Sequence, residues 1–283
     1  EGKVFVSNVF EVENVDNNTG NVDYEGSIQV NGNICENFTV KAKGDVEIRG
    51  VVEGAYVEAG GDIIIARGMN GMGKGTLKAG GNIVSKFLEN VKSVMAGGYI
   101  TTESILHSTV MARSEVTVSG RRGFITGGKV CAGNTITVKT LGSSMGADTI
   151  VEVGSDPSIK MRLQELQTSG MEINKILRSI QPIIDASNQK IAKGIKLEPE
   201  QLKYALSLMK LRDAKNEQLR AETKEMFDIE NELGLMAAGQ IIVTGEVYPG
   251  TKICIGDIST VVKSQSHYCR YIKEAGDIKM VGM

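Results

Sequence analysis

The sequence predicts a mainly β fold, a parallel β-solenoid into which a long antiparallel coiled-coil hairpin is inserted. A short motif recurs at intervals of 16 to 20 residues. Glycine is frequent and proline is rare, with 34 residues against four, which indicates tight turns between regular strands and not a disordered linker. Between residues 155 and 234 the motif gives way to a helical period. These three observations decide the fold class.

The repeated motif consists of an apolar residue, one spacer, an alanine, three turn residues and a second apolar residue. Its six copies are Val40-Ala42-Val46, Val57-Ala59-Ile63, Leu77-Ala79-Ile83, Val94-Ala96-Ile100, Val110-Ala112-Val116 and Val130-Ala132-Ile136. Apolar and polar residues alternate with period 2 around the alanines, which is typical of strands. The interval is too short for the common helical repeats but suits one solenoid coil of three short strands. Stacked coils bury an apolar column that a single coil leaves exposed.

The period divides the chain into three segments. We expect the first part of the solenoid at residues 1–154, the hairpin at 155–234, and strands that rejoin or cap the solenoid at 235–283. The motif spacing returns at Leu235, Ala237 and Ile241. Because solenoid stability comes mainly from neighbouring coils, the solenoid should stay folded when the hairpin is removed.

Two intervals of 20 residues predict outward loops at 67–75 and 120–123. The first loop nearly spells a phosphate-binding loop, but Gly75 stands where Ser or Thr would hold Mg²⁺, and no helix follows. An ordinary solenoid loop is therefore the favoured interpretation. Arg121 and Arg122 in the second loop are interpreted as a solvated basic bump.

The insertion has the pattern of two helices. In the first, apolar residues recur in steps of three and four from Leu163 to Ile191, a heptad seam over four repeats. Pro157 lies near its first position, and Pro182 inside it should kink the helix. After a turn at 193–199, a second helix with a poorer stripe should run from about Pro199 to Leu233. At 1.5 Å per residue, the two helices predict an arm about 50 Å long.

A row of polar residues stands three positions after four register alanines, namely Asp45, Asp62, Asn82 and Glu115. Stacked carboxylates could bind Ca²⁺, which prefers oxygen ligands. Capping of turns by short polar side chains is the favoured alternative, because Tyr99 interrupts the row.

The two histidines offer little support for catalysis or metal binding. His107 could be the base of an acyltransferase, but the hexapeptide spelling of that class is irregular here and a structural histidine is favoured. His267 lacks neighbouring ligands for a metal. A carbohydrate-active β-helix usually has aromatic sugar platforms, and this chain has no Trp. We therefore assign no catalytic, cofactor-binding or metal-binding residue and expect no cofactor.

Bulk properties narrow the function classes. The formal charge of −2 gives no basic field for nucleic acid, and no apolar run approaches the roughly 18 residues of a membrane span. The four cysteines, Cys35, Cys131, Cys254 and Cys269, are widely spaced. Such spacing favours a reduced cytoplasmic protein with buried thiols over a disulfide scaffold or zinc site. Because the chain starts at Glu1 in a strand-like pattern, we expect residues upstream.

The order of the motifs resembles the bacterial flagellar assembly protein A (FapA) family, long listed as a domain of unknown function. The matching stretches are residues 39–46, 59–63, 86–90, 105–108, 123–129, 142–146, 151–154 and 247–250. The resemblance implies a right-handed parallel β-helix, a coiled-coil insertion, a cytoplasmic location and a link to motility or flagellar regulation. It brings no catalytic residues. The resemblance also implies a further domain upstream of the solenoid, which we expect to precede Glu1.

The favoured function is a non-enzymatic cytoplasmic scaffold or regulator. It would bind protein partners through the coiled-coil arm or a face of the β-helix, with a homodimer through one end or face as the preferred assembly. Nucleic acid is not an expected partner. The alternative is a β-helix enzyme that acts on carbohydrate or transfers acyl groups, which would need titratable groups converging in a cleft.

Overall fold

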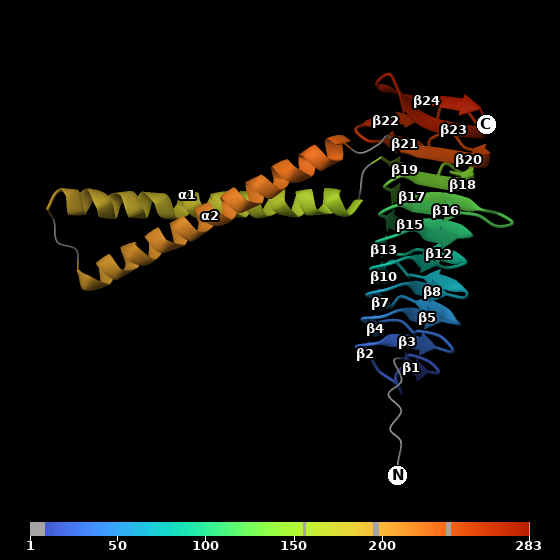
Figure 1. Ribbon diagram of the computed structural model, residues 1–283, viewed down its shortest axis with the longest axis horizontal. Helices are drawn as coiled ribbons and strands as arrows, with labels where there is room; N and C mark the ends of the chain where they lie inside the picture. Colours follow the sequence, from blue (N-terminus) through green and yellow to red (C-terminus); the bar gives the residue numbers. More distant parts are fainter. Residues whose placement is uncertain (1–8, 155–156, 195–197, 236–238, 283) are drawn as a thin grey trace, which may run out of the picture. The chain divides into compact units, whose positions relative to one another are not determined.

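The chain folds into a solenoid unit and a helical unit. The computed structural model describes residues 9–154, 157–194, 198–235 and 239–282. The solenoid unit comprises Glu1–Pro157 and Met236–Met283, and the helical unit Ser158–Leu235. Figure 1 shows the solenoid strands stacked in chain order from β1 to β24.

The coils of the solenoid contribute strands to three parallel stacks. The first stack contains β2 (Val22–Tyr24), β4 (Thr39–Ala42), β7 (Tyr56–Ala59), β10 (Thr76–Ala79), β13 (Ser93–Ala96), the second halves of β15 (Ser104–Ala112) and β17 (Phe124–Ala132), β19 (Thr149–Val153) and β21 (Lys252–Ile255). The second contains β1 (Val9–Val12), β3 (Ser27–Val30), β5 (Val46–Ile48), β8 (Ile63–Ile65), β11 (Ile83–Val84), β14 (Ile100–Thr102), β16 (Glu115–Val118), β18 (Thr135–Leu141) and β20 (Gln240–Val247). The third contains β6 (Val51–Glu53), β9 (Gly68–Asn70), β12 (Phe87–Glu89) and the first halves of β15 and β17.

The register of the first stack confirms the register that the motif predicts. Each motif valine or leucine pairs with its counterpart in the next coil, and each alanine pairs with the next alanine. The apolar members of this column are Val40, Val57, Leu77, Val94, Val110 and Val130, all fully buried. Full burial of one such side chain stabilises the fold by about 1.5–3 kcal/mol. The stacked columns form one continuous core.

Period-2 alternation decides which side chains enter the core. In β8, Ile63 and Ile65 are buried, whereas Ile64 between them is 43 % exposed although all three are isoleucine. Side chains of successive strand residues point to opposite faces. Position in the strand therefore outweighs hydrophobicity here.

The helical insertion splits a single turn of the solenoid. Ala132 pairs with Val153, and Ile136 pairs with Ile241, so the insertion between Val153 and Ile241 lies one coil further on, at the corner equivalent to the one between Ala132 and Ile136. Gly154 and Gly239 flank the insertion and lie against each other, since a Cβ on Gly239 would come within 2.7 Å of the Gly154 nitrogen. Without the insertion, this corner would have the Gly-Gly spelling found elsewhere in the chain.

The expected return of the motif at Leu235 and Ala237 is therefore wrong for Leu235, which is the last residue of helix α2. Ala237 lies outside the described residues. Val153, before the insertion, occupies the stack position that the motif alanine would take. Ile241 does return to the column as expected, paired with Ile136. The sequence spacing misled because one coil is divided between both sides of the insertion.

The expected outward loop at 67–75 is wrong in its first half. Gly68–Asn70 is strand β9, and Met69 within it is fully buried. The corner proper spans residues 71–75, between β9 and β10. The loop at 120–123 does lie between two strands, β16 and β17.

Antiparallel strands close the carboxyl end of the solenoid. Strand β22 (Ile258–Val261) pairs with β21, β23 (Ser266–Glu274) pairs with β20, and β24 (Asp277–Gly282) pairs with β23, each in the antiparallel sense. Tyr271 and Cys269 of β23 are buried against the core. These strands therefore pair with backbone groups of the last coil. Backbone groups left unpaired at a sheet edge would invite pairing with another chain.

The helical unit consists of α1 (Pro157–Ala192) and α2 (Pro199–Leu235). Helix α1 begins at Pro157 and contains Pro182. Gly194, shortly after the end of α1, has a φ of 75°, and its amide donates a hydrogen bond to the Ile191 carbonyl. The helix therefore ends in the left-handed conformation that favours glycine.

The two helices run antiparallel, because partners of rising number on α1 have falling numbers on α2. Arg162 forms a two-pronged ion pair with Glu225, at 2.7 and 3.0 Å. Ile180 and Ile184 pack with Leu208 in a small apolar cluster. The sequence spacing of the second helix predicts an apolar stripe that begins at Leu202, but the Leu202 side chain is 43 % exposed.

Candidate functional site

The polar row at the solenoid corner caps turns. The Asp45 carboxylate accepts from the Asp62 amide at 2.8 Å, and the Asp62 carboxylate accepts from the Asn82 amide at 2.6 Å. Asn82 continues the ladder by accepting from the amide of Tyr99 at 3.0 Å. Each side chain accepts a hydrogen bond from a backbone N–H of the next coil. In an Asx turn, the same kind of side chain accepts from its own segment instead. Glu115 takes no part in these bonds. In the described part of the chain, no three His, Cys, Asp or Glu residues gather as a metal site would require.

The glycine-rich corner at 71–75 is built for packing. Its Lys74 ammonium donates to Glu36 at 2.6 Å and to Asn37 at 2.8 Å. A strand precedes and a strand follows the corner, so no helix N-terminus is available for a phosphate. These contacts support the ordinary solenoid loop.

His107 occupies a corner that needs a left-handed backbone. Its φ is 45°, and the residues in register with it in two other coils, Asn90 and Gly54, have φ 50° and 46°. Asn and His are among the non-glycine residues enriched in this conformation. A Cβ on Gly127 of the next coil would collide with the His107 ring. The histidine is exposed and stacks over that glycine, which supports a structural role.

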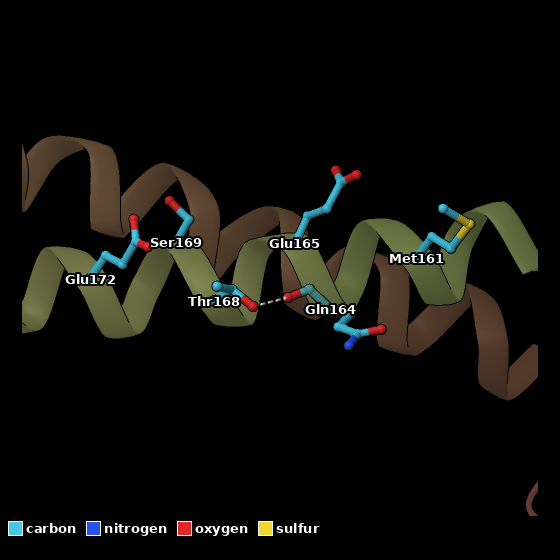
Figure 2. A pocket seen from close by; sticks show the side chains of 6 residues that line it. All are labelled: Met161, Gln164, Glu165, Thr168, Ser169 and Glu172. Carbon is cyan, nitrogen blue, oxygen red and sulfur yellow. Dashed lines mark hydrogen bonds between the residues drawn. The ribbon is translucent and has the colours of Figure 1, made fainter. Parts of the chain in front are cut away.

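A hollow along helix α1, of about 470 Å³, is the first of two candidate cavities. Figure 2 shows its lining, which comes from one face of α1. The Thr168 hydroxyl donates back to the Gln164 carbonyl at 2.9 Å, and the Ser169 hydroxyl donates to Glu222 of α2 at 3.0 Å. Glu165 accepts from Arg162. The Ser169–Glu222 bond links the two helices, the other two bonds lie within α1, and the polar groups do not converge on a common point.

The second cavity is a groove on the side of the solenoid, with a volume of about 620 Å³. Its floor crosses four neighbouring strands, β17, β18, β20 and β23. Register places Phe124 beside Thr140, Thr140 beside Glu246, and Glu246 beside His267. The loop residue Arg122 borders one side of the groove, and Ser143 and Ser144 of a second loop also line it. We call this feature the side groove.

A β-bulge shapes the side groove. Two residues of β20, Thr244 and Gly245, stand opposite the single residue Lys139 in β18 and the single residue Tyr268 in β23. Bulges re-aim side chains and occur often beside binding sites. Tyr268 has φ 48° and is 63 % exposed. A bulky residue in this backbone conformation is strained, and such strain is concentrated at functional sites.

The Glu246 carboxylate of the side groove already has partners within the protein. One oxygen of Glu246 accepts from the Tyr248 hydroxyl at 2.7 Å, and the other lies 3.8 Å from Nδ1 of His267. The hydrogen bond to Glu246 raises the pKa of the Tyr248 phenol. Among the described residues that line the groove, Glu246 is the one carboxylate. Hydrolysis of glycosides generally needs two carboxylates, so the lining fits binding better than this chemistry.

The sequence pointed to some residues of the side groove but not to the groove. Arg122 and His267 were each interpreted as isolated features, and the structure brings both to one cavity. The register between residues 16 to 106 positions apart in the chain decides this neighbourhood, and no local spacing reveals it. The exposed Tyr268 beside His267 was the available signal.

The cysteines carry no disulfide. Cys131 and Cys269 are buried, and Cys35 and Cys254 are partly buried. Cys131 lies 3.8 Å from a Glu152 oxygen that also pairs with Lys129 at 3.0 Å. Among the described residues, no helix is long and apolar enough to span a membrane.

Comparison with known proteins identifies the family. No curated protein and no solved structure matches the chain. A family model described as "Flagellar Assembly Protein A beta solenoid domain" matches residues 8–278, nearly the whole chain. The parallel solenoid and the order of its motifs agree with that description. The chain therefore belongs to the FapA β-solenoid domain family.

Proposed function

We propose that the protein is a non-enzymatic cytoplasmic scaffold or regulator whose helical unit is a coiled-coil arm for a protein partner. Family membership supports a role linked to flagellar assembly. The solenoid would be right-handed and would act as the rigid support. Long insertions in compact domains are usually functional.

The observation that carries the proposal is the exposed apolar surface of the arm. Tyr204, Leu206 and Phe227 of α2 are 56 %, 51 % and 62 % exposed, and Met171 of α1 is 72 % exposed. Solitary exposed apolar residues are normal, but Tyr204 shares a face of α2 with Leu211, two turns further on and 40 % exposed, and an apolar patch on one face indicates an interaction surface. Aromatic residues and Met are enriched at protein interfaces.

A two-fold homodimer through one end or one face of the solenoid is the preferred assembly. Val9 and Phe10 of β1 are 39 % and 41 % exposed, and β1 pairs with one strand, β3. The apolar segment Val4-Phe5-Val6, which would extend this surface, lies outside the described residues. A two-fold dimer through a face that includes these side chains would bury them. Sedimentation equilibrium at increasing concentration measures this, and a strict monomer would contradict it.

The enzyme alternative has weaker support. His107 stands at a corner where its ring packs over Gly127, and the side groove has a single carboxylate in its lining. A base and a nucleophile within hydrogen-bond reach would be needed.

The test is site-specific photocrosslinking in the source bacterium. A photoreactive residue at Tyr204 should capture a discrete partner, and the same residue at Glu217, an exposed polar position on α2, should not. A chromosomal deletion of the arm should change the number of flagella per cell while the solenoid remains folded. Normal flagellation without the arm, together with no difference between the two crosslinking positions, would contradict the proposal.

A further inference from the structure

The dimensions of the side groove fit an extended chain. Its floor of Phe124, Thr140, Glu246 and His267 crosses four strands in register. With strands about 4.8 Å apart, the floor is about 14 Å long. An extended peptide advances about 3.3 Å per residue, so about four residues match this length. The volume of about 620 Å³ is in the range of ligand pockets.

The available charge of the side groove is positive. In the described part of the chain, no ion pair is formed by Arg122, and its side chain is exposed. The Lys139 ammonium donates to the Arg121 carbonyl at 3.0 Å, which leaves other N–H donors of the same group. Glu246 is occupied by Tyr248. A ligand carboxylate would therefore meet two cations, and arginine binds carboxylates with two parallel hydrogen bonds.

The side groove also presents apolar contact area. Phe124 lies on the floor, and Tyr268 stands beside the bulge with 63 % of its surface exposed. The left-handed backbone of Tyr268 costs stability, which a purely structural residue opposite the bulge would not require. Tyr and Arg are the residue types that most often dominate interface energetics.

We infer that the side groove binds an extended acidic segment of a protein partner, with a carboxylate on Arg122 and Lys139 and an apolar side chain against Phe124 and Tyr268. The inference rests on the proposed function, since it names a second contact for a partner of the scaffold. It differs from the arm in location and in chemistry. Acidic motifs bound by basic clusters are a recurring mode of peptide recognition.

The experiment titrates the full chain with a blocked tetrapeptide of alternating glutamate and leucine and follows amide chemical shifts by NMR. We expect saturable shifts at Gly142, Gly245 and Tyr268. The same peptide with glutamine in place of glutamate should bind at least about tenfold more weakly, because the charged hydrogen bonds are lost. Arg122→Gln should weaken the glutamate peptide to a similar degree, whereas Arg49→Gln, an exposed arginine outside the groove, should leave it unchanged.

A second variant separates binding from folding. Tyr268→Gly keeps the left-handed backbone without strain, so it should raise Tm while it weakens the glutamate peptide severalfold. A lower Tm together with unchanged binding would show that Tyr268 is structural and would overturn its assigned role.

Other results overturn the inference itself. These are shifts with inorganic phosphate as large as with the glutamate peptide, stronger binding of a lysine-leucine peptide, stronger binding of digalacturonate, or no saturable binding at all. If the groove fails this test while Tyr204 still captures a partner, the inference falls and the proposed function stands. If both fail, the proposed function falls as well.

Discussion

Truncation of one buried isoleucine should cost several times more stability than truncation of its chain neighbour. Ile63 is fully buried and is stacked in register between Val46 and Ile83. Ile63→Ala removes three carbon atoms, worth about 0.8 kcal/mol each on transfer to water. The cavity left in a stacked column adds to this loss, so the total should be about 3–4 kcal/mol.

The matched control is Ile64→Ala, at a side chain that is 43 % exposed. It should cost less than about 1 kcal/mol, because the site faces solvent. Urea unfolding followed by far-ultraviolet circular dichroism measures both free energies of unfolding. The m-value should stay constant in both variants. Equal losses, or a larger loss for Ile64→Ala, would refute the alternation that places the core.

Three further predictions concern the corners and the carboxyl-terminal cap. Gly127→Ala should destabilise the fold strongly, because the residue has a φ of 68° and an added Cβ would collide with the His107 ring. Combining it with His107→Gly should recover part of the lost stability. Additive effects of the two substitutions in a double-mutant cycle would contradict this contact. Asp62→Ala should cost about 1–3 kcal/mol, because the Asn82 amide loses its acceptor, while Asp62→Asn, which keeps an oxygen, should unfold at nearly the wild-type urea concentration. Burial raises the pKa of the Tyr271 phenol, so the unfolded chain loses this proton at a lower pH than the folded chain, and the stability should fall as the pH rises above about 10. Urea melts of Tyr271→Phe should show a smaller fall. A pH profile identical to that of the wild type would exclude this residue as the cause.

The solenoid core could be predicted from sequence where packing is repetitive. Val57 and Ala59 recur with their partners because each coil must present the same inward surface to its neighbours. The third side of the coil was harder to recognise. Its strands are as short as Gly68–Asn70. Within that strand, Met69 alone has a large apolar side chain, and this side chain is fully buried. A strand of three residues gives too few alternations for a period.

The ends of the insertion could not be located from local spacing. Val153 takes the place of the motif alanine, so the expected small residue gives no signal there. The side groove was missed for a different reason. Lys139 and Tyr268 become neighbours of Gly245 through β-sheet register and a bulge, which depend on contacts between distant segments. A groove built in this way can be predicted only when the pairing register of the strands is known.

The most direct test of the account is a chain in which Gly154 is joined to Gly239, without residues 155–238. The junction would have the length of the corner from Ala132 to Ile136, since Val153 pairs with Ala132 and Ile241 pairs with Ile136. Hydrogen exchange should then show amides of β20 protected as in the full chain, with cooperative melting retained. Rapid exchange throughout β20 would contradict a solenoid that continues in register across the insertion.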